Sequence, residues 1–143
     1  MLYKGFTIIE LLVIIAIFLI FAGISQVAFL NFQNHSNLEI ATYNLVEALR
    51  HAKSNAQQVK QDTKWGIYVV GNTVTVFSGN SYASRNTSLD NSINLTNGIS
   101  SSGLQEVVFE KVSGTTTNVG NIILTLGSQS KTITINEKGT ITY

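Results

Sequence analysis

The chain has 143 residues, with no cysteine, no proline, and nine basic against eight acidic side chains. That length allows one domain of ordinary size plus a separate helix. The lack of cysteine excludes disulfide bonds and thiolate metal sites. A formal net charge of +1 provides no long-range attraction to nucleic acid or to acidic lipid, although it is compatible with close packing of like subunits.

An apolar segment covers the first part of the chain. Residues 11–24 contain no charged side chain, and apolar residues resume at 27–30. Because about 20 mostly apolar residues can cross a bilayer as a helix, residues 6–30 are expected to span a membrane. Lys4 is the only basic residue before this segment, and Arg50 is the first one after it. The positive-inside rule therefore predicts a cytoplasmic N-terminus, with the bulk of the chain on the other side.

One acidic residue, Glu10, interrupts the apolar segment near its start. A charged side chain at the centre of a membrane helix costs roughly 2.5–3.5 kcal/mol on insertion scales, and less near the interface, so it needs a partner. If the chain were cut after Gly5, the new α-amino group of Phe6 would be such a partner. The amine and the carboxylate of one helix are held apart by its rigid backbone, so a neighbouring subunit would have to supply the amine. The position of Glu10 therefore predicts a filament or a membrane complex.

Residues 4–10 read Lys-Gly-Phe-Thr-Ile-Ile-Glu and precede the apolar run. They resemble the prepilin leader of type IV pilins and type II secretion pseudopilins. The resemblance implies that a prepilin peptidase removes residues 1–5 by cutting after Gly5, methylates the amino group of Phe6, and leaves Glu10 as the family's assembly glutamate. An ordinary secretory signal or plain anchor is the alternative, but a signal has an apolar region of about 7–15 residues and no acidic residue before it.

The same resemblance implies partners and a location. The partners would be the prepilin peptidase and methyltransferase, other pilin or pseudopilin subunits, an inner-membrane assembly platform and membrane lipid. The chain would first be a single-pass protein of the inner (cytoplasmic) membrane with a periplasmic or extracellular globular domain, and then part of a cell-surface filament. The machine itself (pilus, secretion system or competence apparatus) and the rank of the subunit (major or minor) remain open.

The helical pattern continues beyond the apolar segment. Apolar positions recur every three or four residues from 38 to 59, which places them on one face of a helix. We expect a continuous helix from Phe6 to about Lys60, ending at Asp62-Thr63. Residues 31–143 are expected to form a globular pilin-like domain, with helix to about residue 62 and sheet after it. The expected stripe contains Leu38, Ala41, Leu45, Ala48 or Leu49, Ala52, Ala56 and Val59.

From Trp65 onward the pattern favours strands. Gly71-Asn72 is a two-residue hairpin signal between the first two strands, whereas residues 78–92 and 113–118 are expected as loops and 100–103 as a turn. The expected strands are 65–70, 73–77, 93–95, 105–112, 121–126, 131–136 and 140–143. The predicted fold is α+β, with one long N-terminal helix packed on an antiparallel sheet of about six or seven strands.

The order of helix first and sheet after also resembles the pilin family. The closing segment, residues 131–143, resembles the final hairpin of GspH/FimT-type minor pseudopilins, on the basis of its strand pattern and the glycine, Gly139, before the last strand. This second resemblance implies a minor subunit.

Catalytic and metal-binding side chains have no partner set in the sequence. His35 and His51 are 16 residues apart on the expected helix, about 24 Å at the standard helical rise, so they cannot share a metal within one chain. No phosphate-binding loop or nucleophile with a matching base is present. We therefore expect no cofactor, no metal and no catalytic residue, which disfavours an enzyme tethered by one helix. The remaining acids considered, assigned to turns or to a water-facing strand edge, are Asp62, Asp90, Glu106 and Glu110.

Three basic residues, Arg50, Lys53 and Lys60, have the spacing of one helix face. Together with Lys138 they could contact DNA, while the alternative is a solvated face with cations favoured near a helix C-terminus. DNA-binding pilins of this type carry a Gly-Arg-x-Arg motif at the closing hairpin, where this chain has Gly-Thr-Ile-Thr at residues 139–142. That departure argues against nucleic acid as a partner. A structural pilin or pseudopilin subunit is therefore the leading hypothesis, and a DNA-binding minor pilin in DNA uptake is the alternative.

Overall fold

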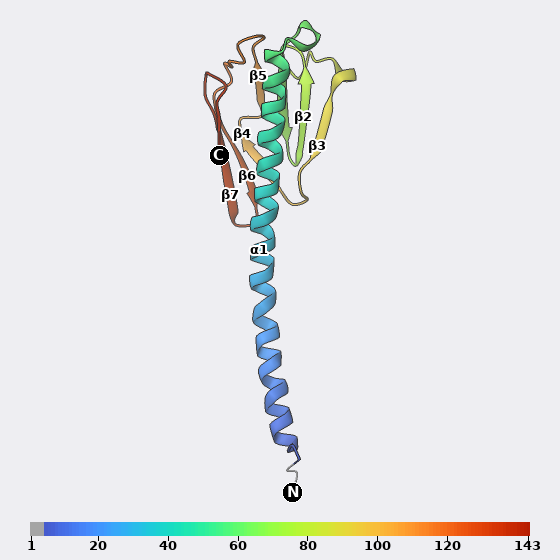
Figure 1. Cartoon of the computed structure of the whole chain (residues 1–143), viewed down its shortest axis with the longest axis vertical. Coiled ribbons are helices and arrows are strands. Elements are labelled where there is room, and N and C mark those ends of the chain that lie inside the picture. Colours follow the sequence, from blue (N-terminus) through green and yellow to red (C-terminus); the bar gives the residue numbers. More distant parts are fainter. Residues whose placement is uncertain (1–4) are drawn as a thin grey trace. The chain divides into compact units, whose positions relative to one another are not determined.

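The computed structural model describes the backbone of residues 5–143 and, within that range, all side chains except those of residues 23–31. The chain divides into two compact units, Met1–Asn34 and His35–Tyr143. Helix α1 (Ile8–Gln57) contributes residues to both units, and all the strands belong to the second (Figure 1).

The first unit consists of the N-terminal part of α1 and the residues before it. Most of the expected leader, residues 1–4, lies outside the described residues. Within the described part of the chain, no helix combines the length and apolar character needed to cross a membrane. In the expected membrane span, residues 6–30, the side chains of residues 23–30 also lie outside the described part of the structure.

In the second unit, α1 packs on the sheets through the predicted stripe. Because 3.6 residues make one helical turn, residues that recur every three or four positions lie on one face of the helix. In α1 this face is directed at the sheets. In Figure 1 this part of the helix runs in front, with β2 and β3 to its right and β6 and β7 to its left. The buried apolar residues of this part of the helix, each at most 2% exposed, are Leu38, Ala41, Leu45, Val46, Ala48, Leu49, Ala52 and Ala56.

The C-terminal end of α1 differs from the expectation. The helix stops at Gln57, and the backbone enters the left-handed region at Val59 (φ 54°) before a short 3-10 helix, η1 (Lys60–Asp62). Val59, the last expected member of the stripe, therefore lies outside the helix and is only half-buried. A second 3-10 helix, η2 (Thr87–Leu89), forms in the expected loop 78–92. The helical part of the fold is thus not one long helix alone.

Eight strands form two four-stranded antiparallel sheets. The first sheet has the order β3-β2-β1-β5, and the second has the order β4-β6-β7-β8. In the first sheet the strands are β1 (Trp65–Val70), β2 (Thr73–Ser78), β3 (Asn91–Asn94) and β5 (Glu106–Phe109). In the second they are β4 (Ser100–Gly103), β6 (Gly120–Leu126), β7 (Gln129–Ile135) and β8 (Ile141–Thr142).

The prediction of a single sheet of six or seven strands was therefore wrong in two respects. The chain passes from the first sheet to the second at residues 95–99, between β3 and β4. In addition, Ser100–Gly103, expected as a turn, is the edge strand β4, which pairs in register with β6. This Ser-Ser-Ser-Gly segment has no apolar alternation of its own, because an edge strand can be held by main-chain hydrogen bonds to its neighbour alone. The predicted hairpin at Gly71-Asn72 is confirmed between β1 and β2.

Candidate functional site

The residues just before α1 have no regular secondary structure. Gly5, Phe6 and Thr7 precede the first helical residue, Ile8. Apart from its chain neighbours, a Cβ atom built on Gly5 would meet no atom of the described residues within 4 Å, and Phe6 is 74% exposed. The Gly5–Phe6 peptide bond therefore lies in open, non-helical chain, which is the kind of backbone that proteases cleave.

Thr7 caps the start of α1. Its Oγ1 accepts a hydrogen bond from the backbone N–H of Glu10 at 3.3 Å, and its carbonyl oxygen accepts one from the N–H of Leu11 at 3.2 Å. A threonine followed three residues later by a glutamate is the capping-box pattern. The sequence analysis missed this role, although the pattern is visible in the printed sequence. The cap fixes Glu10 in the first turn of the helix.

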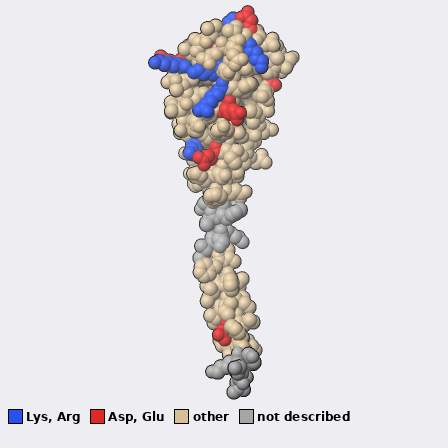
Figure 2. All heavy atoms as spheres, in the orientation of Figure 1, with Lys and Arg blue, Asp and Glu red and all other residues tan. Residues whose placement is uncertain are grey.

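The Glu10 side chain is exposed and has no partner within the described part of this chain: no ion pair or hydrogen bond reaches its carboxylate. It is the one acidic residue of residues 5–22, and Figure 2 shows acidic colour at one place in that otherwise tan segment. The first turn of a helix favours negative charge because the N-terminal N–H groups carry partial positive charge. Both carboxylate oxygens remain available to a donor from another molecule.

Large apolar side chains surround α1 on every side near Glu10. From Ile8 to Phe21, each of them is exposed, from 38% for Ile14 to 82% for Ile8. A helix that is apolar all round is normally buried all round, and an exposed apolar surface of this extent marks an interaction site. This part of α1 therefore presents an apolar surface suited to contact with other apolar groups.

The basic residues considered as possible DNA contacts do not form one group, and the three that were predicted to share a helix face do not all lie on the helix. Arg50 and Lys53 lie in α1, whereas Lys60 lies in η1, beyond the left-handed residue Val59. Lys138 lies in the turn between β7 and β8. The prediction of one shared helix face was wrong because it assumed that α1 continues to residue 60.

Three of these cations are engaged within the fold. The Cζ of Arg50 lies 5.9 Å from the centroid of the Tyr143 ring. The Nζ of Lys53 donates hydrogen bonds to the carbonyl oxygens of Lys138 at 3.1 Å and Gly139 at 2.9 Å, which joins α1 to the closing turn. The Nζ of Lys60 lies 5.5 Å from the centroid of the Trp65 ring, within cation–π range. The basic side chains thus have structural roles that the spacing did not reveal.

The two glutamates of the β5 region were expected to face water, but both are half-buried and bonded. Glu106 Oε1 accepts a hydrogen bond from the backbone N–H of Tyr82 at 2.9 Å, and Glu110 Oε1 lies 2.6 Å from Lys64 Nζ. The apolar residues at 107 and 109 point inward as predicted. The difference arises because the segment after β2 returns to cover Glu106, a contact 24 residues distant in sequence.

The remaining candidate acids form ion pairs. Asp62 Oδ1 lies 3.0 Å from Lys111 Nζ, and Asp90 Oδ2 accepts a hydrogen bond from Arg85 Nε at 2.8 Å. The hydrogen bond to Asp90 raises the pKa of Arg85 further above its usual value. His35 and His51 are both exposed, as expected. Within the described residues, no three His, Cys, Asp or Glu side chains come close enough to hold a metal ion.

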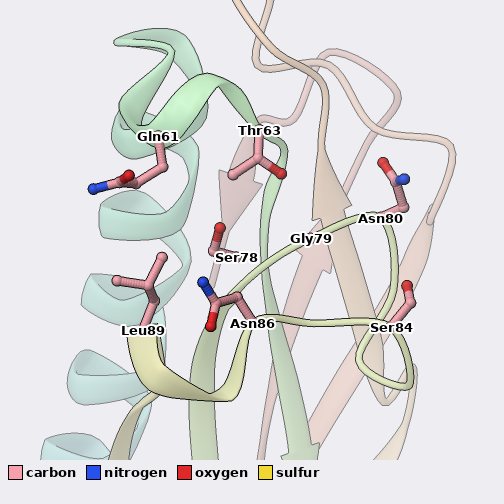
Figure 3. A pocket seen from close by; sticks show the side chains of 8 residues that line it. All are labelled: Gln61, Thr63, Ser78, Gly79, Asn80, Ser84, Asn86 and Leu89. Carbon is pink, nitrogen blue, oxygen red and sulfur yellow. The ribbon is translucent and has the colours of Figure 1, made fainter.

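A crevice of about 340 Å³ lies in the second unit beside η1 and the end of β2. Figure 3 shows its amide and hydroxyl side chains, together with Leu89. None of the lining residues carries a charge, so the crevice offers no acid, base or nucleophile set. Its lining residues are Gln61, Thr63, Ser78, Gly79, Asn80, Ser84, Asn86 and Leu89.

The family comparison agrees with the N-terminal geometry. Residues 1–25 match the family model of the prokaryotic N-terminal methylation motif. The match includes Gly5, Phe6 and Glu10, and it supports a type IV pilin-like subunit that is processed by a prepilin peptidase and assembles with other pilin subunits. A search of curated proteins and a search of solved structures each found no match. The matched residues therefore include the first part of α1 and the residues before it, but none of the strands.

Proposed function

We propose that this chain is a structural subunit, a minor pilin or pseudopilin, of a type IV pilus or a type II secretion filament. The observation that carries the proposal is the N-terminal part of α1, where exposed apolar side chains surround a Glu10 carboxylate that has no partner within the described residues. The methylation motif at residues 1–25 supports the same assignment. Proteins with this motif are structural subunits and not enzymes.

Assembly would follow from cleavage after Gly5. Cleavage creates an amino group on Phe6, and this group stays cationic after methylation. Two unit charges 4 Å apart attract by about 4 kcal/mol at an effective dielectric constant of 20. Glu10 of one subunit would gain this energy by meeting the Phe6 amine of a neighbour shifted along the helix axis, while the apolar side chains around it pack against neighbouring helices.

Before assembly, residues 6–30 would anchor the chain in the inner membrane with the N-terminus in the cytoplasm. Lys4 before the segment and no further basic residue until Arg50 support this orientation. The globular second unit would then be periplasmic or extracellular. The hairpin of β7 and β8, with Gly139 before the last strand, supports the GspH/FimT-type minor subgroup as the finer assignment.

Mass spectrometry of the mature N-terminus tests this proposal. We expect the chain in its own cells to begin at Phe6 and to carry one additional methyl group on the amine. Gly5→Ala should block cleavage, because the added Cβ changes the residue on which the peptidase acts. A wild-type chain that still begins at Met1 would contradict the proposal.

A further inference from the structure

One end of the second unit contains four non-glycine residues in left-handed backbone conformations. These are Val59 (φ 54°), Gln61 (φ 61°), Asp62 (φ 54°) and Val112 (φ 67°). For a β-branched residue this conformation is a genuine outlier, because its Cβ substituents crowd the backbone. Glycine or asparagine would fit such a position with less strain.

Of the two β-branched residues, Val112 is the more unusual because its side chain is 71% exposed, whereas Val59 is half-buried. Its backbone N–H is held by a hydrogen bond to the carbonyl oxygen of Ala56 at 3.1 Å, which keeps the loop against the end of α1. The exposed isopropyl group gains little packing inside the chain to offset the strain. Such strain persists where the residue serves a function. We propose that Val112 is an interface anchor that inserts into an apolar pocket on a second copy of this chain.

The second unit carries a pocket of suitable size and chemistry. A pocket of about 300 Å³ lies between α1, β2 and β3. Ala48, Val76 and Ile93 give it an apolar lining, and the polar residues around them are Glu47, His51 and Asn91. An apolar anchor surrounded by polar contacts is the usual arrangement at the centre of a protein interface.

The charges around the anchor and the pocket are complementary. Glu47 is exposed and forms no ion pair among the described residues, and the same holds for Lys60. Lys60 lies at the same end of the unit as Val112, since Lys111 binds Asp62 at 3.0 Å. The other charges at this end are paired, Lys64 with Glu110 and Lys111 with Asp62, so placing Val112 in the pocket of a neighbour would bring the end that carries the remaining cation, Lys60, towards Glu47.

Anchor and pocket are different surfaces of one molecule, so the contact joins copies head to tail. Repeated contacts of this kind build an open filament unless the rotation closes a ring. The inference rests on the proposed filament function and specifies one lateral contact between globular units. It is separable from the Glu10 contact, which involves the first unit alone.

Cysteine cross-linking in full-length chains tests the contact, because the natural chain has no cysteine background. A chain carrying both Val112→Cys and Ile93→Cys should form a ladder of disulfide-linked oligomers when its filaments are oxidised. Chains with either substitution alone should not form the ladder. The matched control is Val70→Cys with Ile93→Cys, because Val70 is also an exposed valine, at 53%, in an ordinary strand position.

A second variant separates assembly from folding. Val112→Asn should raise the melting temperature, because asparagine tolerates the left-handed conformation, yet lower incorporation into filaments at least tenfold. Two results would overturn the contact while leaving the proposed function intact. One is unchanged incorporation of Val112→Asn. The other is the absence of a ladder when chains carrying both Val112→Cys and Ile93→Cys still form filaments. Wild-type chains that remain uncut and unassembled would overturn both.

Discussion

Glu10 shows how one residue can be well placed within its own chain and still unsatisfied. Its backbone N–H is bonded to Thr7 in the helix cap, while its carboxylate has no partner among the described residues. The surrounding exposed apolar side chains make an unpaired charge costly once they are covered. A partner from another subunit, as proposed above, would resolve this conflict.

We predict that Glu10→Ala leaves the chain synthesised and cleaved but lowers its incorporation into filaments by about 100-fold or more. The expected loss is the charge pair with the neighbouring Phe6 amine, about 4 kcal/mol in the estimate above. Immunoblots of sheared filaments and of membranes measure the two pools. Glu39→Ala is the matched control, because Glu39 is an exposed acid of α1 in the second unit. Equal incorporation of both variants would argue against the charge pair.

Lys53 has a structural role that its position on α1 did not suggest. Its ammonium group donates to two carbonyl oxygens of the closing turn. We predict that Lys53→Met destabilises the fold by about 1.5–3 kcal/mol, the usual value of hydrogen bonds to a charged group, while keeping the apolar stem. Chemical denaturation measures this loss. Lys138→Met should be close to neutral, because Lys138 takes part through its carbonyl oxygen; a similar loss in both would refute the assignment.

Among the elements, β4 was missed by the sequence analysis. Its serines lack the alternating pattern of a half-buried strand, and its last residue, Gly103, has a left-handed backbone (φ 85°). A Cβ at that position would collide with the carbonyl oxygen of Asn121 on β6. Backbone requirements of this kind determine that residues 100–103 form a strand, and they depend on Asn121, which lies 18 residues further along the chain.

We predict that Gly103→Ala destabilises the fold by about 1–3 kcal/mol, from backbone strain together with this collision. Thermal unfolding of the purified full-length protein measures the effect. Ser102→Ala is the control, since Ser102 is an exposed neighbour on the same strand and should change stability by less than about 0.5 kcal/mol. A neutral Gly103→Ala would mean that β4 pairs differently from the register described here.

The C-terminal end of α1 also differs from the prediction. The apolar spacing predicted the buried face of the helix correctly from Leu38 to Ala56. The spacing also included Val59 and Lys60, but the backbone leaves the helical conformation at Val59. The competing factor is partly tertiary: the carbonyl oxygen of Ala56 accepts a hydrogen bond from the N–H of Val112, in the loop before β6, as well as one from the N–H of Val59 in a tighter local turn.

For the molecule as a whole, the distribution of charge bears on the DNA-binding alternative. Basic side chains are scattered over the second unit in the face shown by Figure 2, with acidic ones among them. Removal of residues 1–5 takes away Lys4 and leaves eight basic and eight acidic side chains. Neutralisation of few phosphates gives weak, strongly salt-dependent binding.

We predict that the mature protein shows no retained DNA in gel shifts at physiological salt. Binding at low salt should fall off steeply as salt is added. Arg50→Ala and Lys138→Ala should each alter that residual binding only slightly, because no continuous basic track connects them. Tight binding at physiological salt that is lost in both variants would instead favour the DNA-uptake alternative.

The sequence by itself determined the apolar N-terminal segment, the position of Glu10 within it, the buried stripe of α1 and the β1–β2 hairpin. Each of these follows from residues close together in the chain, where helical and strand periodicity and turn chemistry act directly. Only the tertiary structure decided the division into two sheets, the strand β4, the end of α1, the Lys53 bonds and the strained, exposed Val112. These depend on which distant segments meet, because the hydrogen bonds and contacts that fix them join residues far apart in sequence.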